Sequence, residues 1–238
     1  MITRNRLVIA IATTLMCSVA VAKDQTWTHQ GQPAQIVELF TSEGCSSCPP
    51  ADKFLSQFQS HSRLWRDVIP MAFHVDYWDR LGWKDEYASP SYSQRQRLYH
   101  SYGAVQSVYT PGFVVDGGEW RGFFYRKDLP HRESEAAPSL TLIKQGNDFS
   151  LKFEQSGRYT AHLVVLAMDE ATKVKAGENR GRYLEHDFVV LDKRQITGEQ
   201  DWQFDNVELD ARADAVAVWL TQGVDGQTVQ TVAGLLQR

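Results

Sequence analysis

Short apolar runs alternate with helical repeats in the N-terminal half of the chain. The runs at residues 34–40 and 68–75 are apolar and contain β-branched residues, which is typical of buried strands. Apolar residues recur at helical spacing from Pro49 onward, and residues 89–102 are predicted to form a second helix with serines available as caps. Another apolar run follows Pro111 and ends in a Gly-Gly turn. This order of elements predicts an α/β domain.

Helical spacing disappears after residue 137, and alternating apolar and polar positions take over. A charged, proline-bearing linker at residues 126–138 precedes the change, and Gly146 and Gly226 lie at turns between the alternating segments. We therefore predict a second, all-β, sandwich-like domain at residues 138–238. Its seven predicted strands are Ser139–Lys144, Phe149–Glu154, Tyr159–Ala167, Leu184–Leu191, Trp202–Leu209, Ala215–Thr221 and Thr228–Leu235.

The first 22 residues have the features of a secretory signal peptide. Arg4 and Arg6 precede an apolar run at residues 7–21, which ends in a small-residue pattern suited to cleavage after Ala22. The run is shorter than the roughly 20 apolar residues that a membrane helix needs. We therefore predict a signal peptide at residues 1–22, a first domain at residues 23–137, and a periplasmic or secreted protein that is not held by a membrane after cleavage.

Cysteine usage and charge narrow the function further. The formal net charge of −4 does not favour nucleic acid as a partner. Cys17 falls in the predicted signal peptide, so Cys45 and Cys48 can pair only with each other. In an oxidising compartment a Cys-x-x-Cys pair is a disulfide, a redox centre or a clip for a soft metal. A bridge across so short a loop stabilises a fold weakly, which disfavours a purely structural role.

The position of the two cysteines favours redox chemistry. They follow a predicted strand and precede a predicted helix, so they should lie at the N-terminus of that helix. Free backbone N–H groups and the helix dipole stabilise a thiolate there and lower its pKa below about 8.5. We expect Cys45 to be the exposed, attacking sulfur and Cys48 to be the resolving thiol.

The order strand, Cys-x-x-Cys, helix, strand, helix, Thr-Pro and strand is similar to the thioredoxin fold. This resemblance implies that Pro111 is a cis-proline packed against the disulfide and that the backbone of Thr110 meets a bound substrate. It also implies that Glu38 is a buried acid beneath the disulfide, able to transfer protons. The sequence differs from thioredoxin in the Ser-Ser pair between the cysteines and in the two prolines that follow.

Longer motifs resemble a secreted bacterial family called domain of unknown function 1223. These motifs are Glu-Leu-Phe-Thr-Ser-Glu-Gly-Cys-Ser-Ser-Cys-Pro-Pro-Ala-Asp from residue 38, His-Val-Asp-Tyr-Trp-Asp-x-Leu-Gly-Trp from residue 74, Tyr-Thr-Pro from residue 109 and Gly-Glu-Asn-Arg-Gly-Arg at residues 177–182. The resemblance runs from about residue 34 to the C-terminus and implies a thioredoxin-like domain, but it brings no established substrate.

Two further segments are candidates for the site. Residues 74–87 are crowded with acidic and aromatic side chains after the second predicted strand, where Trp78 would line a substrate groove or only pack a loop, and Asp76 would accept a proton near the thiols. The glycine and arginine residues of 177–182 suit a carboxylate or phosphate, but we expect a solvated hairpin tip. We also expect His186 to lie at a strand end rather than in a catalytic dyad.

Three classes of function follow. The first is a thiol:disulfide oxidoreductase in which Cys45 and Cys48 exchange with protein thiols, protein disulfides or a periplasmic redox partner, with no cofactor besides the disulfide. The second is a Cu(I)-binding or copper-delivery module, in which both cysteines and an imidazole such as His74 or His100 hold the metal. The third is a non-catalytic binding protein that keeps the disulfide as part of its scaffold.

Overall fold

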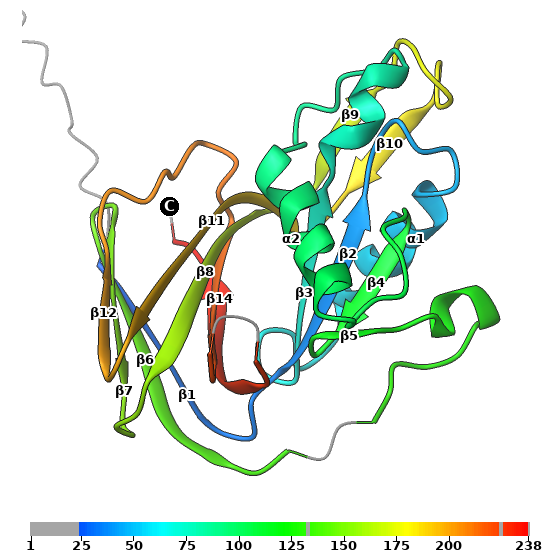
Figure 1. Ribbon diagram of the computed structural model, residues 1–238. Helices are drawn as coiled ribbons and strands as arrows, with labels where there is room; N and C mark the ends of the chain where they lie inside the picture. Colours follow the sequence, from blue (N-terminus) through cyan, green and yellow to red (C-terminus); the bar gives the residue numbers. More distant parts are fainter. Residues whose placement is uncertain (1–23, 132–133, 224–225, 238) are drawn as a thin grey trace, which may run out of the picture.

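The structure is a computed structural model that describes residues 24–131, 134–223 and 226–237, so the predicted signal peptide lies outside the described residues. Figure 1 shows the arrangement of the elements. In chain order they are β1 (Gln25–Gly31), β2 (Gln35–Thr41), α1 (Pro49–Ser56), η1 (Gln57–Ser60), β3 (Val68–His74), η2 (Asp76–Leu81), α2 (Pro90–Ser101), β4 (Gly112–Val115), β5 (Gly118–Glu119), η3 (Gly122–Tyr125), β6 (Ala137–Gln145), β7 (Asp148–Phe153), β8 (Tyr159–Ala167), β9 (Glu170–Lys173), β10 (Tyr183–His186), β11 (Val189–Gly198), β12 (Asp201–Phe204), β13 (Ala215–Thr221) and β14 (Thr228–Leu235).

One eight-stranded sheet runs through the molecule in the order β14-β13-β8-β11-β3-β2-β4-β5. A four-stranded sheet, β1-β6-β7-β12, packs against part of it, and β9 and β10 form a separate two-stranded ribbon. Strand β3 joins the two halves of the large sheet, because it pairs in parallel with β2 on one side and with β11 on the other. The large sheet therefore crosses the predicted domain boundary between residues 137 and 138.

The predicted α/β fold class with a thioredoxin-like domain is wrong. The part of the chain that the structure describes holds fourteen strands and only two α-helices, arranged as several sheets. Most strand pairs of the large sheet are antiparallel, and only the pairs made by β3 are parallel. The sequence pattern of residues 23–137 was interpreted as a separate α/β domain. In the structure β3 also pairs with β11, so the strands of this segment belong to a larger, β-rich sheet.

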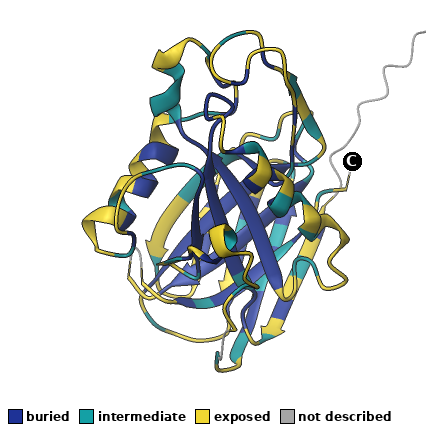
Figure 2. Cartoon of the chain, turned by 90° about the vertical axis from the view of Figure 1, so that its right-hand side faces the viewer, coloured by how far each residue is buried: buried dark blue, intermediate teal, exposed yellow. Residues whose placement is uncertain are grey.

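The two α-helices cover opposite faces of the large sheet. Side chains alternate between the faces of β2, so Val37 and Leu39 pack with Leu55 of α1, whereas Ile36 and Phe40 pack with the tyrosines of α2. Strand β8 alternates in the same way, and its other face packs against the four-stranded sheet. The buried strands lie at the centre of Figure 2, with exposed residues on the outer sides of the helices.

Local signals set the ends of these elements. Ser89 caps α2 by accepting a hydrogen bond from the backbone N–H of Ser91, with Pro90 in the first turn. Strand β3 is buried along its whole length because it pairs with β2 throughout, meets β11 at Ala72 and is covered on both faces. The predicted strand at residues 184–191 is instead split into β10 and β11 at Phe188, whose φ is 58°.

Among the described residues, neither helix has the length and apolar character needed to cross a membrane.

Candidate functional site

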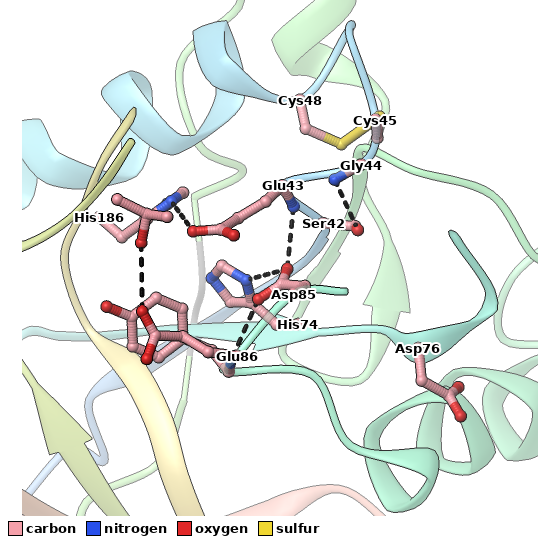
Figure 3. A network of polar contacts seen from close by, with 12 residues as sticks. Ser42, Glu43, Gly44, Cys45, Cys48, His74, Asp76, Asp85, Glu86 and His186 are labelled. Atoms are coloured by element: carbon pink, nitrogen blue, oxygen red, sulfur yellow. Dashed lines mark hydrogen bonds and ion pairs between the residues drawn. A yellow bond between two sulfur atoms is a disulfide. The ribbon is translucent and has the colours of Figure 1, made fainter. Parts of the chain in front are cut away.

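The Cys-x-x-Cys loop connects the end of β2 to the start of α1. Cys45 and Cys48 form a disulfide with a Cα–Cα distance of 5.5 Å, which confirms the predicted pairing. Cys48 is the N-cap of α1, and its carbonyl oxygen accepts hydrogen bonds from the backbone N–H groups of Ala51 and Asp52. The disulfide therefore lies at the N-terminus of the helix, above the polar side chains seen in Figure 3.

The prediction of an exposed Cys45 sulfur is wrong, because both cysteines have an exposed fraction of 0%. The loop exposes Ser46 and Ser47 instead. The Ser47 hydroxyl lies 3.3 Å from the Cys45 sulfur, and it must be the donor while the sulfur is in a disulfide. The sulfurs are covered because segments from both halves of the chain pack on this loop.

The loop at residues 177–182 is one of these segments. It lies between β9 and β10 and exposes every residue except Asn179, as expected of a solvated hairpin tip, but it also contacts the Cys-x-x-Cys loop, which the sequence did not predict. The Asn179 side chain is fully buried and donates hydrogen bonds to the carbonyl oxygens of Glu43 and Cys45, at 2.8 and 2.9 Å. Arg182 donates to the Asn179 side-chain oxygen and so orients the amide. Hydrogen bonds from Ser46, first from its side chain and then from its backbone N–H, lower the pKa of the Glu178 carboxyl group. Residues 177–182 thus hold the Cys-x-x-Cys loop in place.

Trp78 covers the loop from the other side. A side chain at Gly44 would come within 3.0 Å of the Trp78 Cβ atom, so the glycine permits this close contact. The Trp78 indole N–H donates a 2.8 Å hydrogen bond to the Thr110 hydroxyl, and the Thr110–Pro111 peptide bond is cis. The structure therefore links the predicted substrate-binding residues Trp78 and Thr110 directly, next to the turn that carries Cys45.

Glu38 does not lie beneath the disulfide. It shares a face of β2 with Ile36 and Phe40, the face covered by α2, whereas the helix that begins at Cys48 covers the opposite face. Its carboxylate is buried in a two-pronged ion pair with Arg95, at 2.6 and 2.8 Å, and accepts a further hydrogen bond from Tyr99. Glu38 is thus part of the ion pair between β2 and α2, and its predicted role in proton transfer at the disulfide has no geometric basis.

Asp76 also lies away from the cysteines. Its backbone N–H donates to the Ser93 hydroxyl of α2, and that hydroxyl donates to the Asp76 carboxylate. Figure 3 shows the Asp76 side chain well separated from the disulfide. The structure therefore does not bring this predicted proton acceptor to the thiols.

A different set of titratable side chains lies below the Cys-x-x-Cys loop. His74 and Asp85 form a fully buried pair with a 2.7 Å contact, and the same Asp85 oxygen accepts from the Glu43 backbone N–H. The Glu43 carboxylate in turn accepts a 2.6 Å hydrogen bond from the Trp83 indole. Figure 3 shows Glu43 between the disulfide and the imidazoles of His74 and His186.

Burial and charge pairing have opposite effects on the pKa values of His74 and Asp85. Burial by itself lowers the pKa of His74, but the contact with the Asp85 carboxylate outweighs burial and raises the pKa above 6.5. Burial likewise works to raise the pKa of Asp85, yet the His74 charge and hydrogen bond hold it below its ordinary value. Asp52, on α1, has its pKa raised because burial dominates over the nearby imidazoles of His186 and His74.

Several buried polar atoms of this set lack a hydrogen-bond partner within the described residues. They include Glu43 Oε1, Asp52 Oδ1, His74 Nε2 and both ring nitrogens of His186. His186 Nε2 lies 3.5 Å from Glu43 Oε1, and the His74 and His186 rings meet edge to face at 4.9 Å. The five residues Glu43, Asp52, His74, Asp85 and His186, here called the buried polar cluster, therefore retain unused capacity for protons or polar ligands.

A family model described as "Protein of unknown function (DUF1223)" matches residues 36–222. The chain belongs to the DUF1223 family. The match confirms the family that the sequence motifs indicate, and it includes both the Cys-x-x-Cys loop and residues 177–182. A comparison with curated proteins found no match.

Two solved structures have a similar fold. The crystal structure of protein AGR_C_4864 from Agrobacterium tumefaciens has a TM-score of 0.60 and 23% identity, over 86% of this DUF1223 chain and 94% of that chain. HBP35 of Porphyromonas gingivalis has a TM-score of 0.50 and 12% identity, over 87% of this chain and 76% of its own. Because both sequence identities are below 25%, these similarities show a shared fold alone.

The described residues of this DUF1223 protein do not form a metal site of the kind that the copper hypothesis requires. Among residues 24–131, 134–223 and 226–237, no group of three or more His, Cys, Asp or Glu side chains is arranged to hold a metal ion. The two sulfurs are bonded to each other, and His74 uses Nδ1 for Asp85. Copper binding by Cys45, Cys48 and His74 therefore stays a prediction.

Sequence reasoning missed most of the residues around the disulfide. Glu43 and His74 stood inside the quoted family motifs, and Asn179 stood inside the Gly-Glu-Asn-Arg-Gly-Arg segment, so the motifs were a usable signal. Asp52 is the last residue of the quoted motif that starts at residue 38, so it carried the same signal. His186 carried no comparable signal, because a single histidine at a strand end is a common structural feature.

Proposed function

We propose that this DUF1223 protein is a thiol:disulfide oxidoreductase that acts through Cys45 and Cys48 in the periplasm or after secretion. The observation that carries the proposal is the placement of the Cys45–Cys48 disulfide at the N-terminus of α1, where a thiolate is stabilised by the helix dipole. A disulfide across three residues closes a very short loop and contributes little as a staple. Its partners are protein thiols or disulfides.

The exchange requires two sequential thiol steps. A thiolate of a partner dithiol attacks the Cys45 sulfur, the Cys45–Cys48 bond breaks, and Cys48 leaves as a thiolate that takes up a proton. The second partner thiolate then attacks the mixed disulfide and releases Cys45. Two electrons pass from the partner to the protein, which ends with two thiols. The Ser47 hydroxyl, 3.3 Å from the Cys45 sulfur, supports this assignment because it can donate a hydrogen bond to the departing Cys45 thiolate.

The buried state of the sulfurs means that exchange needs a local opening of the loop. Ser46 and Ser47 are exposed, whereas Asn179 and Trp78 cover the loop on two sides. A partner that lifts the Ser-Ser turn would reach Cys45 before Cys48, since Cys48 is the N-cap of α1. The buried polar cluster lies beneath the loop and supplies titratable groups for the proton that reduction takes up.

A redox titration of the Cys45/Cys48 pair is the direct test. We expect a reduction potential between about −120 and −270 mV, the range of exchange catalysts. A potential below roughly −300 mV together with no turnover of a disulfide substrate would contradict the proposal, because structural disulfides have such potentials. The measurement is made on the oxidised protein in defined glutathione or dithiol buffers.

Single-cysteine variants separate the two roles. Cys48→Ser should accumulate a mixed disulfide at Cys45 with a partner, since no resolving thiol remains, whereas Cys45→Ser should trap none and lose all activity. The double variant is the matched control for loss of the disulfide itself. Equal trapping by both single variants would show that the cysteines react without the proposed order.

A further inference from the structure

A cleft separate from the disulfide lies between α1 and the β9–β10 ribbon. Its volume is about 660 Å³, within the range of small-molecule sites of roughly 300–1,000 Å³. One wall is the polar side of α1, and the other is the two-stranded ribbon that Figure 1 shows beside the helix. Neither cysteine lines this cleft.

The charge of the lining is strongly negative. Among the described residues that line the cleft, five carry carboxyl groups and Lys53 is the only lysine or arginine. No salt bridge to lysine or arginine joins any of the five within the described residues. Tyr87 and Gln59 donate hydrogen bonds to three of them, and these neutral donors do not cancel the negative charge. The five are Asp52, Asp169, Glu170, Glu185 and Asp187.

The inner wall contains buried polar atoms that nothing in the described chain satisfies. Asp52 and His186 line the cleft, yet only 5% and 2% of these residues are exposed. Asp52 Oδ1 and both ring nitrogens of His186 have no hydrogen-bond partner there, although His186 Nε2 lies 3.5 Å from Glu43 Oε1. Buried polar groups are normally paired, so unpaired ones at the base of a cleft indicate a place where a ligand donates hydrogen bonds.

An aromatic ring stands at the rim. Tyr183 is the first residue of β10 and is 66% exposed, so its ring is open to solvent beside the cleft. An aromatic face beside carboxylates is the combination that receives organic cations, because the ring face and the carboxylates both attract positive charge.

We propose that this cleft binds an organic cation with ammonium or guanidinium groups, held by the wall carboxylates and Tyr183 and by hydrogen bonds to Asp52 and His186. The cation is either a free polyamine or a lysine or arginine side chain of a polypeptide. The inference does not depend on thiol chemistry, because the cleft excludes both cysteines.

Calorimetric titration of the intact, oxidised protein tests the proposal. The two probes are spermidine and an acetylated peptide with two lysines, at low ionic strength. Saturable binding of spermidine identifies a polyamine-type site, and binding of the peptide alone assigns the cation to a polypeptide. Failure of both probes to bind overturns the proposal.

Three variants place the binding in the cleft. Glu185→Gln and Tyr183→Leu change exposed side chains and should each weaken binding about threefold or more, and Asp52→Asn should weaken it about tenfold. The matched control is Glu199→Gln, which removes an exposed carboxylate that does not line the cleft. Equal affinity in all four variants overturns the proposal, because it shows general charge attraction. The two exposed-site variants keep the test valid if Asp52→Asn does not fold.

Discussion

At the scale of single residues, Asn179 connects the C-terminal half of the chain to the Cys-x-x-Cys loop. Its amide satisfies two buried carbonyl groups, those of Glu43 and Cys45. The change Asn179→Ala leaves both carbonyls unpaired, which should cost about 1–3 kcal/mol of unfolding free energy. Because the same bonds hold the loop closed, dithiothreitol should reduce the disulfide roughly tenfold faster in the variant.

Two measurements check the Asn179 prediction. Urea unfolding gives the stability, and thiol release under pseudo-first-order conditions gives the reduction rate. Gln106→Ala is the control, because Gln106 is an exposed residue outside the loop contacts. A slower or unchanged reduction rate in Asn179→Ala would show that the loop does not open through this contact.

The His74–Asp85 pair predicts a dependence of stability on pH. His74 has a pKa raised above 6.5, so its contribution is fully present below about pH 6.5 and is lost as pH rises through the folded-state pKa. Asp85 has a lowered pKa, so its contribution is present above 3.8 and is lost as pH falls through its folded-state value. The wild type should therefore lose stability from weakly acidic to alkaline pH.

The variant His74→Gln isolates this effect. It should be less stable than the wild type at weakly acidic pH, and the difference should shrink as pH rises, because the wild type loses its charged pair. Urea unfolding across the pH range measures the difference. A constant difference between the two proteins would mean that His74 stays neutral in the folded state.

Site residues could be predicted from the sequence where a chemical motif includes them. They could not be predicted where the result depends on which face of a strand a helix covers. Cys45 and Cys48 followed from their spacing. Glu38 was misplaced because β2 is apolar on both sides, so its sequence pattern does not show which face α1 covers. The alternation of side chains then places Glu38 against Arg95 instead of the disulfide.

At the scale of elements, α1 positions the disulfide through its apolar side. Leu55 is fully buried against Val37 and Leu39 of β2. We expect Leu55→Ala to lower the unfolding free energy by about 2–5 kcal/mol, through lost burial and a cavity. The disulfide should also become easier to reduce, because the helix N-terminus loses its support. Gln57→Ala, an exposed change just beyond α1, is the control in urea unfolding and thiol release.

Most element types were predictable, but their partners were not. Strands β8, β13 and β14 have the predicted bounds, because their apolar runs are clear. Strands β1 and β9 were missed because their polar residues give no strong strand pattern. The sequence pattern also carries no information on long-range register, so the pairing of β11 with β3 could not be foreseen.

At the scale of the whole molecule, two pairs of strands connect the two sides of the predicted domain boundary. Strand β1 pairs with β6 over Gln25↔Lys144 to Gly31↔Ala137, and β3 receives β11 through the Ala72 N–H bond to the Phe188 carbonyl at 2.8 Å. The core beneath α2 likewise combines residues from both halves, such as Phe40 and Val164. Separation at residue 137 would expose these apolar faces and two strand edges.

We therefore expect the chain to unfold as one unit and its halves to fail alone. Far-ultraviolet circular dichroism and tryptophan fluorescence should give coincident urea transitions, since tryptophans lie in both halves and share the cooperative sheet. Residues 24–137 and 138–238, produced separately, should lack stable tertiary structure, because each loses the partner of an edge strand and part of a shared core. Two separate transitions, or a half that folds alone, would instead support the two-domain division predicted from the sequence.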